Sequence, residues 1–183
     1  MNLVEKQLSS EIKYNGKVIS VREDVVELPD GNKSMREVVQ HNGAVGVVAL
    51  TDNNEIVLVK QFRAGIQRIT LELPAGKLEI GEDPLSCGMR ELEEETGYKA
   101  ENYRKFTSFA TSPAIMQEII HVYLATNLTK GEKKPDEGEF VEMHIVPVAD
   151  AKRMVISGEI EDGKTIIGIL LTVEYLKSLG VDI

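Results

Sequence analysis

The chain has 183 residues and a net charge of −9, from 21 basic and 30 acidic side chains. This length fits one domain with a small appendage, and a content of 42% hydrophobic and 28% charged residues excludes a disordered or fibrous chain. The acidic balance argues against nucleic acid as a partner. A single cysteine, Cys87, excludes an intramolecular disulfide and a multi-cysteine zinc site. Without a membrane-spanning apolar run or a secretory signal, the sequence predicts a cytoplasmic protein that has no contact with membranes.

The first forty residues are predicted to form strands. Residues 18–28 are rich in β-branched side chains, and a turn at 29–31 separates them from a second extended segment at 33–41. A hairpin turn is expected at 52–54. Further strands are expected at residues 44–50, 55–62, 69–73, 103–110, 119–125 and 140–146.

A helix is predicted between residues 84 and 95, where apolar or small side chains recur at intervals of four, three and four. Asp83 can cap its start, Pro84 suits the first helical position, and Gly97 suits a left-handed exit. Two more helices are expected at about 148–157 and 164–179. The strands and helices do not alternate regularly, so the predicted fold is α/β with a mixed sheet and helices packed on it.

The predicted helix at 84–95 carries an unusual concentration of negative charge. Glu91 and Glu95 are i,i+4 neighbours, and Glu94 stands one turn from Glu91. Like charges at this spacing destabilise a helix by a few tenths of a kcal/mol per pair, and an anion at the C-terminal end opposes the helix dipole. A divalent cation such as Mg²⁺ would offset both effects, because hard ions take carboxylate oxygens as ligands.

Neighbouring residues could complete such a metal site. Arg90 lies four residues before Glu94 and can pair with its carboxylate, while Glu82 can reach toward the same region from the helix entrance. The preceding loop contains Gly76, which allows a tight path, and the carbonyl of Ala75 could supply another oxygen ligand. The alternative interpretation is that this acidic helix face is simply solvated.

The spacing of these residues favours the metal site. Gly76 is followed by Glu82, then by Arg90, Glu91 and Leu92, then by Glu94 and Glu95, and finally by Gly97 and Tyr98. This stretch of 23 residues resembles the Nudix box, the loop–helix motif of the Nudix hydrolase superfamily, and departs from it only at Tyr98, where an aliphatic residue is usual. The resemblance implies the Nudix fold, in which helices sandwich a mixed sheet.

The resemblance also implies roles for these residues. Glu91, Glu95 and the carbonyl of Ala75 would be metal ligands, and Glu94 would be a further ligand or a catalytic group. Arg90 would orient the glutamates. The cofactor would be Mg²⁺, with Mn²⁺ as a substitute, and the reaction would be hydrolysis of a nucleoside diphosphate linked to another group.

Short motifs outside the box resemble the ADP-ribose pyrophosphatase group. They are Arg36-Glu37, Lys60-Gln61-Phe62-Arg63, Leu71 to Gly76, Thr111-Ser112-Pro113 before Glu118, and Asp136 to Glu142. This likeness implies hydrolysis of ADP-ribose to AMP and ribose 5-phosphate by a homodimer. Residues 1–42 would form an N-terminal β segment that crosses to the partner subunit, and residues 43–183 would form the Nudix domain.

The same likeness implies a catalytic base and a substrate pocket. The base would be a glutamate of the loop at 130–139, with Glu139 preferred over Glu137. Arg36 and Arg63 are candidates to bind phosphate or stack on adenine; either could instead be a surface charge or form an interface salt bridge. Three residues complete the candidate pocket: Glu37, Glu72 and Glu118.

Other functions are left open by the sequence. The same chemistry could act on a different nucleotide sugar, such as GDP-mannose or another ADP-sugar. A protein that senses ADP-ribose without hydrolysis is disfavoured, because the box glutamates are intact and the chain has no room for a DNA-binding domain. His41, His121 and His144 show no ligand spacing, and Cys87 is expected to pack in the core.

Overall fold

The computed structural model describes residues 2–133, 138 and 140–183. The strands are β1 (Lys6–Asn15), β2 (Ser20–Glu27), β3 (Lys33–Gln40), β4 (Ala44–Leu50), β5 (Glu55–Arg63), β6 (Arg68–Glu72), β7 (Ala75–Lys77), β8 (Tyr98–Ala110), β9 (Ile119–Lys130) and β10 (Glu142–Pro147). The helices are α1 (Pro84–Thr96), α2 (Val148–Ser157) and α3 (Gly163–Ser178). The chain divides into two compact units, one of residues 1–43 and 110–119, the other of residues 44–109 and 120–183.

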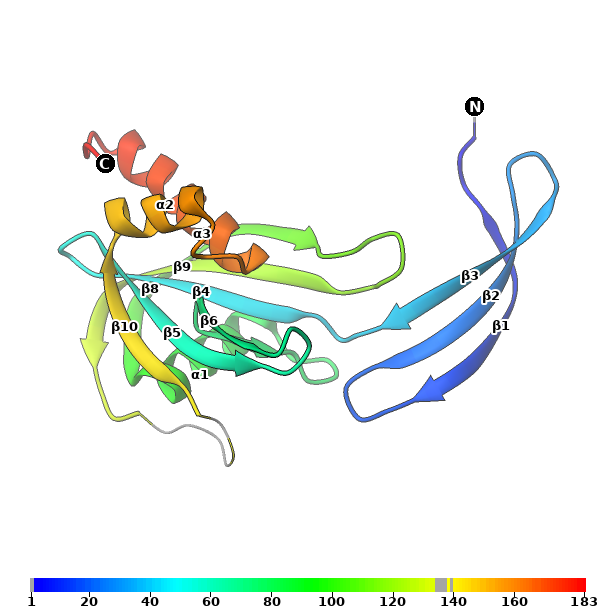
Figure 1. The fold of residues 1–183 in the computed structure, drawn as a ribbon, viewed down its shortest axis with the longest axis horizontal. Coiled ribbons are helices and arrows are strands. Elements are labelled where there is room, and N and C mark those ends of the chain that lie inside the picture. Colours follow the sequence, from blue (N-terminus) through cyan, green and yellow to red (C-terminus); the bar gives the residue numbers. More distant parts are fainter. Residues whose placement is uncertain (1, 134–137, 139) are drawn as a thin grey trace. The chain divides into compact units, whose positions relative to one another are not determined.

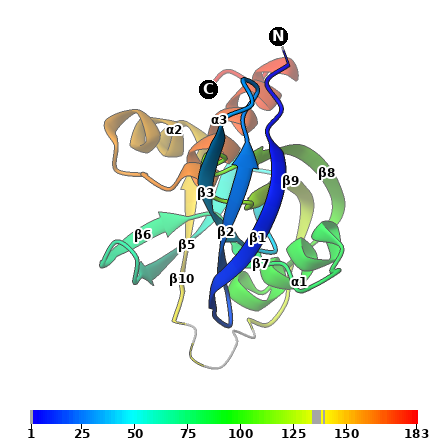
Figure 2. The ribbon, with the colours of Figure 1, turned by 90° about the vertical axis from the view of Figure 1, so that its right-hand side faces the viewer.

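The first unit is built on a three-stranded antiparallel sheet in which β2 lies between β1 and β3 (Figure 2). All ten residues of β1 are exposed. Among the described residues of this unit, Val26 is the only buried large hydrophobic side chain. Three strands that bury so little apolar surface do not form a core of their own.

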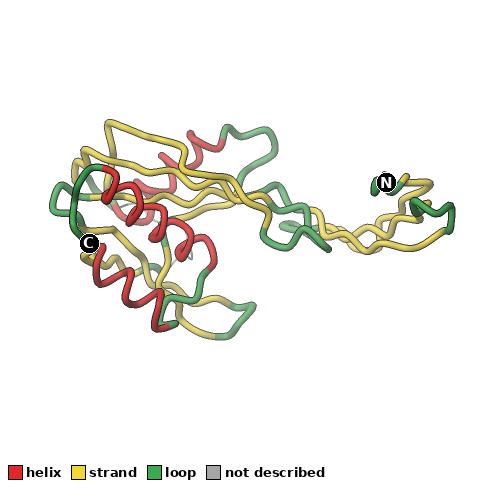
Figure 3. Tube along the Cα trace, turned by 90° about the horizontal axis from the view of Figure 1, so that it is seen from above, coloured by secondary structure: helices red, strands yellow, loops and turns green. Residues whose placement is uncertain are grey.

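The second unit holds a larger mixed sheet with the order β10-β5-β4-β9-β8 (Figure 1). The central pair β4 and β9 is parallel, β6 pairs with β5, and β7 pairs with β4. Within the described part of the chain, helices occur only in this unit (Figure 3). None of these helices is long and apolar enough to cross a membrane.

Helices cover both faces of the larger sheet (Figure 1). On one face, Cys87 and Leu92 of α1 pack with apolar residues of β4, such as Val47. On the other face, α2 and α3 pack on a second cluster that includes Leu58 and Ile169. The chain therefore has the predicted α/β architecture, a mixed sheet between helices with an N-terminal β-rich unit.

The ends of α1 follow the sequence prediction. The Asp83 carboxylate accepts a hydrogen bond of 2.9 Å from the Ser86 N–H, Pro84 is the first helical residue, and Gly97 leaves the helix with φ 76°. Inside the helix, a Cβ on Gly88 would come within 3.1 Å of the Val45 and Val47 side chains. Close contact with β4 therefore fixes the distance at which α1 lies from the sheet.

The expected strand ends differ from the structure in several places. β8 begins at Tyr98, directly after the helix, and not at 103; β9 continues to Lys130 and not to 125. The last strand begins at Glu142 and not at 140. Phe140, which was expected in that strand, lies outside it and is 89% exposed. The short strand β7 (Ala75–Lys77) was not predicted, since three residues beside a proline carry no recognisable strand pattern.

Candidate active site

Two glutamates of α1 are buried within the second unit. Glu91 is 8% exposed and Glu95 is 3% exposed. Charged carboxylates are rarely buried so deeply unless cations or hydrogen-bond donors surround them. The solvated interpretation of this helix face is therefore wrong for these two residues, although the side chain of Glu94 is 24% exposed.

The loop before α1 is shaped around Glu91. A Cβ added to Gly76 would lie 1.8 Å from Glu91 Oε1, 1.9 Å from Cδ and 2.4 Å from Cγ. Only glycine at this position leaves room for the carboxylate to rest against the loop backbone. Gly76 also pairs with Val45 in β7, so its backbone cannot shift away from Glu91. The close approach of the Glu91 side chain therefore requires glycine at this position.

Glu95 contacts the residue before Gly76. Its Oε2 accepts a hydrogen bond of 3.0 Å from the backbone N–H of Ala75. The preceding carbonyl, that of Pro74, accepts a hydrogen bond of 2.9 Å from the Val47 N–H. These contacts fix the segment whose Ala75 carbonyl was predicted to be a metal ligand.

Arg90 links the glutamates of the loop and the helix. Its Nη1 donates to Glu91 Oε1 at 2.8 Å and to Glu94 Oε2 at 2.9 Å, and its Nη2 forms an ion pair with Glu82 Oε1 at 3.3 Å. Burial alone would lower the pKa of Arg90, but the charges of Glu91 and Glu94 outweigh it and raise the pKa. Arg90 therefore stays charged and restrains the rotamers of these carboxylates.

Cys87 lies within this cluster but is unreactive. It is completely buried, as expected for a packing residue, and accepts a hydrogen bond of 3.5 Å from Arg90 Nη2. Burial, with the negative charges of Glu82 and Glu91, raises the pKa of the thiol to about 12. A thiol in this state is not a nucleophile at neutral pH.

Arg63 and Glu72 form a second cluster on β5 and β6. Arg63 Nε and Nη2 donate to the two oxygens of Glu72 at 2.7 and 2.6 Å, a bidentate pair. Glu72 is 1% exposed and also accepts hydrogen bonds from Thr70 Oγ1, at 2.5 Å, and from Lys164 Nζ. Burial would raise the pKa of Glu72, but Arg63, Lys164 and Thr70 outweigh it and lower the pKa to about 2.

The two clusters are electrostatically connected. The pKa of Arg63 is raised first by its hydrogen bonds to Glu72, and the negative charges of Asp162 and Glu95 add to this effect. The structure thus brings together seven of the predicted residues in the second unit: Arg63, Glu72, Ala75, Arg90, Glu91, Glu94 and Glu95.

The oxygen-rich donor set fits a hard divalent cation. Buried carboxylates and a backbone carbonyl are ligands that Mg²⁺ prefers, and the loop backbone at Gly76 leaves no side chain between it and Glu91. Among the described residues, no three acidic, histidine or cysteine side chains are already grouped as a metal cage. In the described structure, the Arg90 guanidinium forms ion pairs with Glu91 and Glu94 and partly neutralises the negative charge of these carboxylates.

Three predicted pocket residues belong to the first unit. Arg36 forms a bidentate pair with Glu5 at 3.0 and 2.5 Å, and Oε1 of Glu118 lies 3.4 Å from Nδ1 of His41. Glu37 is exposed in β3. The two candidate bases, Glu137 and Glu139, lie outside the described residues.

Sequence reasoning missed some buried polar residues near the second cluster. Lys164 and Thr165 lie at the start of the helix expected at about 164–179 and were given no role, yet both contact polar atoms of the β6–β7 segment. Asp162, just before these residues, is the sequence signal that marks the start of this helix, since aspartate is a favourable N-cap. Gln61, on β5, has a buried Nε2 without a hydrogen-bond partner among the described residues.

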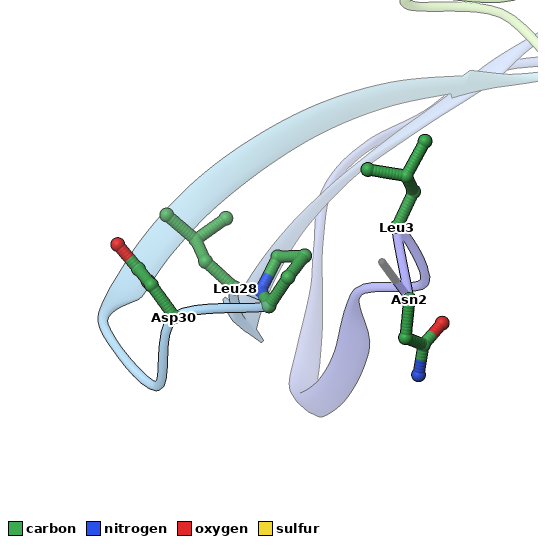
Figure 4. Close-up of a pocket in the computed structure, with 5 residues that line it drawn as sticks. Asn2, Leu3, Leu28 and Asp30 are labelled. Atoms are coloured by element: carbon green, nitrogen blue, oxygen red, sulfur yellow. The ribbon is translucent and has the colours of Figure 1, made fainter.

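A concave surface elsewhere in the molecule has no such chemistry. It lies in the first unit and is lined by Asn2, Leu3, Leu28, Pro29 and Asp30 (Figure 4). Its one charged side chain, Asp30, bonds to Asn32. We therefore place the candidate active site at the acidic cluster on α1, where charged groups converge, and not at this cavity.

Two features together characterise this class of protein. One is a mixed sheet between helices, and the other is an acidic helix whose glutamate lies against a glycine-containing loop. The NUDIX domain model matches residues 40–166, and the model of the nucleoside diphosphate sugar hydrolase N-terminal domain matches residues 5–39. This chain belongs to the Nudix hydrolase family.

Individual relatives span nearly all of the chain. An ADP-ribose pyrophosphatase of Bacillus subtilis (strain 168) is 49% identical over 166 residues, which are 90% of each chain. A methanol dehydrogenase activator of Bacillus methanolicus is 45% identical over 175 residues, covering 94% of this chain and 92% of the relative. A crystal structure of an ADP compounds hydrolase superposes with a TM-score of 0.86 at 21% identity over 96% of both chains, which supports the fold.

Proposed function

We propose that this protein hydrolyses the pyrophosphate bond of ADP-ribose to give AMP and ribose 5-phosphate. The proposal is supported by the 49% identical relative, which is named for this activity and is covered almost completely. It is also supported by the acidic cluster, because a diphosphate substrate needs concentrated positive charge beside it and carboxylates can recruit that charge as metal ions.

Glu91, Glu95, Glu94 and the carbonyl of Ala75 would hold Mg²⁺, or Mn²⁺ in its place. When bound, the ion neutralises charge on the pyrophosphate and lowers the pKa of a coordinated water. Burial of Glu91 and Glu95 restricts the conformations of both carboxylates at the proposed metal site. Preorganised ligands of this kind lose little conformational entropy on binding.

The remaining residues would bind and orient the substrate and move a proton. Arg90 holds Glu91 and Glu94 in fixed rotamers. Arg63, whose side chain is 41% exposed, would bind a phosphate oxygen while Glu72 holds the other edge of its guanidinium. Glu139, or Glu137, would accept the proton of the attacking water.

The protein is proposed to act as a homodimer in which the N-terminal sheet crosses to the partner. The first unit exposes Ile12 (54%), Tyr14 (57%) and Met35 (57%), apolar side chains that a partner subunit would cover. Arg36, Glu37 and Glu118 would then contribute to a substrate pocket. Sedimentation equilibrium tests this, and a monomer at micromolar concentration would refute the dimer.

Other nucleotide sugars are the remaining candidates for substrate, because the acidic cluster recognises only the diphosphate. A panel that includes GDP-mannose and further ADP-sugars, assayed for release of AMP or GMP, separates these candidates. We expect the highest kcat/KM on ADP-ribose. A higher value for GDP-mannose would reassign the substrate without changing the chemistry.

The burial of Glu91 and Glu95 against a glycine loop is the observation that carries the proposal. It predicts that hydrolysis needs a divalent ion and both carboxylates. The test is AMP release from ADP-ribose with Mg²⁺ and with a chelator, in the natural protein and in Glu95→Gln. Equal AMP release in all of these conditions would refute the assignment.

A further inference from the structure

A lysine is buried at the start of the last helix, outside every motif described above. Lys164 is the second residue of α3 and is only 6% exposed. Its Nζ forms ion pairs with Glu72 and, at 2.9 Å, with Asp162. A buried ammonium carries a large desolvation cost and stands at the unfavourable end of the helix dipole.

The helix itself does not need this cation. Asp162 already caps α3 by accepting hydrogen bonds from the Thr165 N–H at 3.0 Å and from Thr165 Oγ1 at 2.6 Å. Thr165 Oγ1 in turn accepts a hydrogen bond of 2.9 Å from the Leu73 N–H, which ties the helix to the β6–β7 segment. The cost of burying Lys164 is therefore offset by two carboxylates, that of the capping residue Asp162 and that of Glu72, which lies outside the helix.

Glu72 is shared between two cations. Its Oε1 accepts from Arg63 Nε, and its Oε2 accepts from both Arg63 Nη2 and Lys164. Among the described residues, the hydrogen bonds of Arg63 use Nε and Nη2 and not Nη1, and the side chain is 41% exposed, so one edge of this guanidinium is accessible. Lys164 neutralises part of the negative charge of Glu72. The positive charge of Arg63 is therefore less neutralised by Glu72 and attracts an anionic ligand at the open edge more strongly.

We propose that Lys164 is a positioning residue that acts through Glu72 to keep the open edge of Arg63 available to a diphosphate group. The inference rests on the proposed function for its substrate, but it adds a residue that touches neither the ligand nor the acidic cluster. It assigns to α3 a part in substrate affinity, distinct from its part in the core.

A double-mutant cycle on the full-length protein tests this pathway. Lys164→Met keeps the length of the buried side chain and removes its charge. We expect it to raise the KM for ADP-ribose about tenfold with less than a threefold change in kcat, the pattern of lost binding. In an Arg63→Ala background, the same substitution should change KM less than twofold, because the residue through which it acts is gone.

Lys177→Met is the matched control. It is the same substitution on the same helix, at an exposed pair with Glu174, and it should leave KM and kcat unchanged. If Lys164→Met does not fold, Lys164→Met combined with Glu72→Gln removes both buried charges together, and we expect this pair to fold. Because Lys164 acts through Glu72, the pair should have the same KM as Glu72→Gln alone, and a further rise in KM on adding Lys164→Met would refute the pathway.

The inference is overturned if Lys164→Met leaves KM unchanged, or if it raises KM equally with and without Arg63. Failure of the proposed function looks different: the natural protein would then release no nucleotide from any nucleotide sugar. In that event, the role of Lys164 is tested by calorimetric titration of inorganic pyrophosphate, with chelator present, into the proteins of the same double-mutant cycle. If Lys164→Met weakens pyrophosphate binding in the natural background but not in the Arg63→Ala background, the inference is supported; equal losses of affinity in both backgrounds refute it.

Discussion

Adding one methyl group at Gly76 should disable the acidic cluster while leaving the fold in place. In Gly76→Ala, the new Cβ would stand 1.8 Å from Glu91 Oε1, against 3.4 Å for an ordinary contact. Glu91 Cγ, at 2.4 Å, collides as well, so turning the carboxylate alone gives no relief. The whole side chain must leave its rotamer, and the oxygen must retreat by more than an ångström from its place beside Arg90.

A displacement of about 1 Å in a catalytic group can cost about 10²-fold in rate. We therefore expect kcat/KM for ADP-ribose to fall about 10²-fold in Gly76→Ala, with a higher Mg²⁺ concentration needed for half-maximal rate. Steady-state kinetics across a Mg²⁺ series, with a thermal melt of each variant, measures this. Gly65→Ala is the control, because a Cβ there meets no atom within 4 Å. Natural activity and Mg²⁺ dependence in folded Gly76→Ala would refute the geometry proposed for Glu91.

Three further predictions concern the carboxylates. Glu95→Gln should lower kcat by at least about 10²-fold and reduce the rise in melting temperature that Mg²⁺ causes in the natural protein; an equal rise would remove Glu95 from the ligands. Glu139→Gln should lower kcat by about 10²-fold or more with little change in KM, whereas normal turnover in both it and Glu137→Gln would exclude a base from this loop. Glu72 has a folded pKa of about 2, below its unfolded value of 4.5, so its contribution to stability is present above pH 4.5 and is lost as the pH falls toward 2. Between pH 5 and pH 3, urea unfolding of the natural protein should lose about 2 kcal/mol more than Glu72→Gln; equal losses would contradict the pairing.

The α/β fold and the centre of the site could be predicted because they depend on local patterns. The ends of α1 follow from Asp83, Pro84 and Gly97, whose conformational preferences act within a few residues. The i,i+4 spacing of Glu91 and Glu95 fixes them on one helix face whatever surrounds it. Spacing also identified the family, which the domain match then confirmed.

Features that depend on distant contacts could not be predicted. The burial of Lys164 against Glu72 joins residues 92 positions apart, and no local pattern distinguishes it from an exposed lysine. Strand β7 exists because Ala75 and Gly76 pair with β4, and its sequence alone has no strand character. Likewise, a spacing rule places Arg90 near Glu94 but does not reveal its contacts with Glu82 and Cys87.

Product analysis of ADP-ribose in ¹⁸O-labelled water is the most direct test of the central claim, that a buried carboxylate cluster on α1 directs hydrolysis of a diphosphate. We expect AMP and ribose 5-phosphate, one of them carrying a single ¹⁸O, when Mg²⁺ is present, and neither product in chelator or in Glu95→Gln. Unchanged ADP-ribose in the presence of Mg²⁺, or products formed equally well by Glu95→Gln, would contradict it.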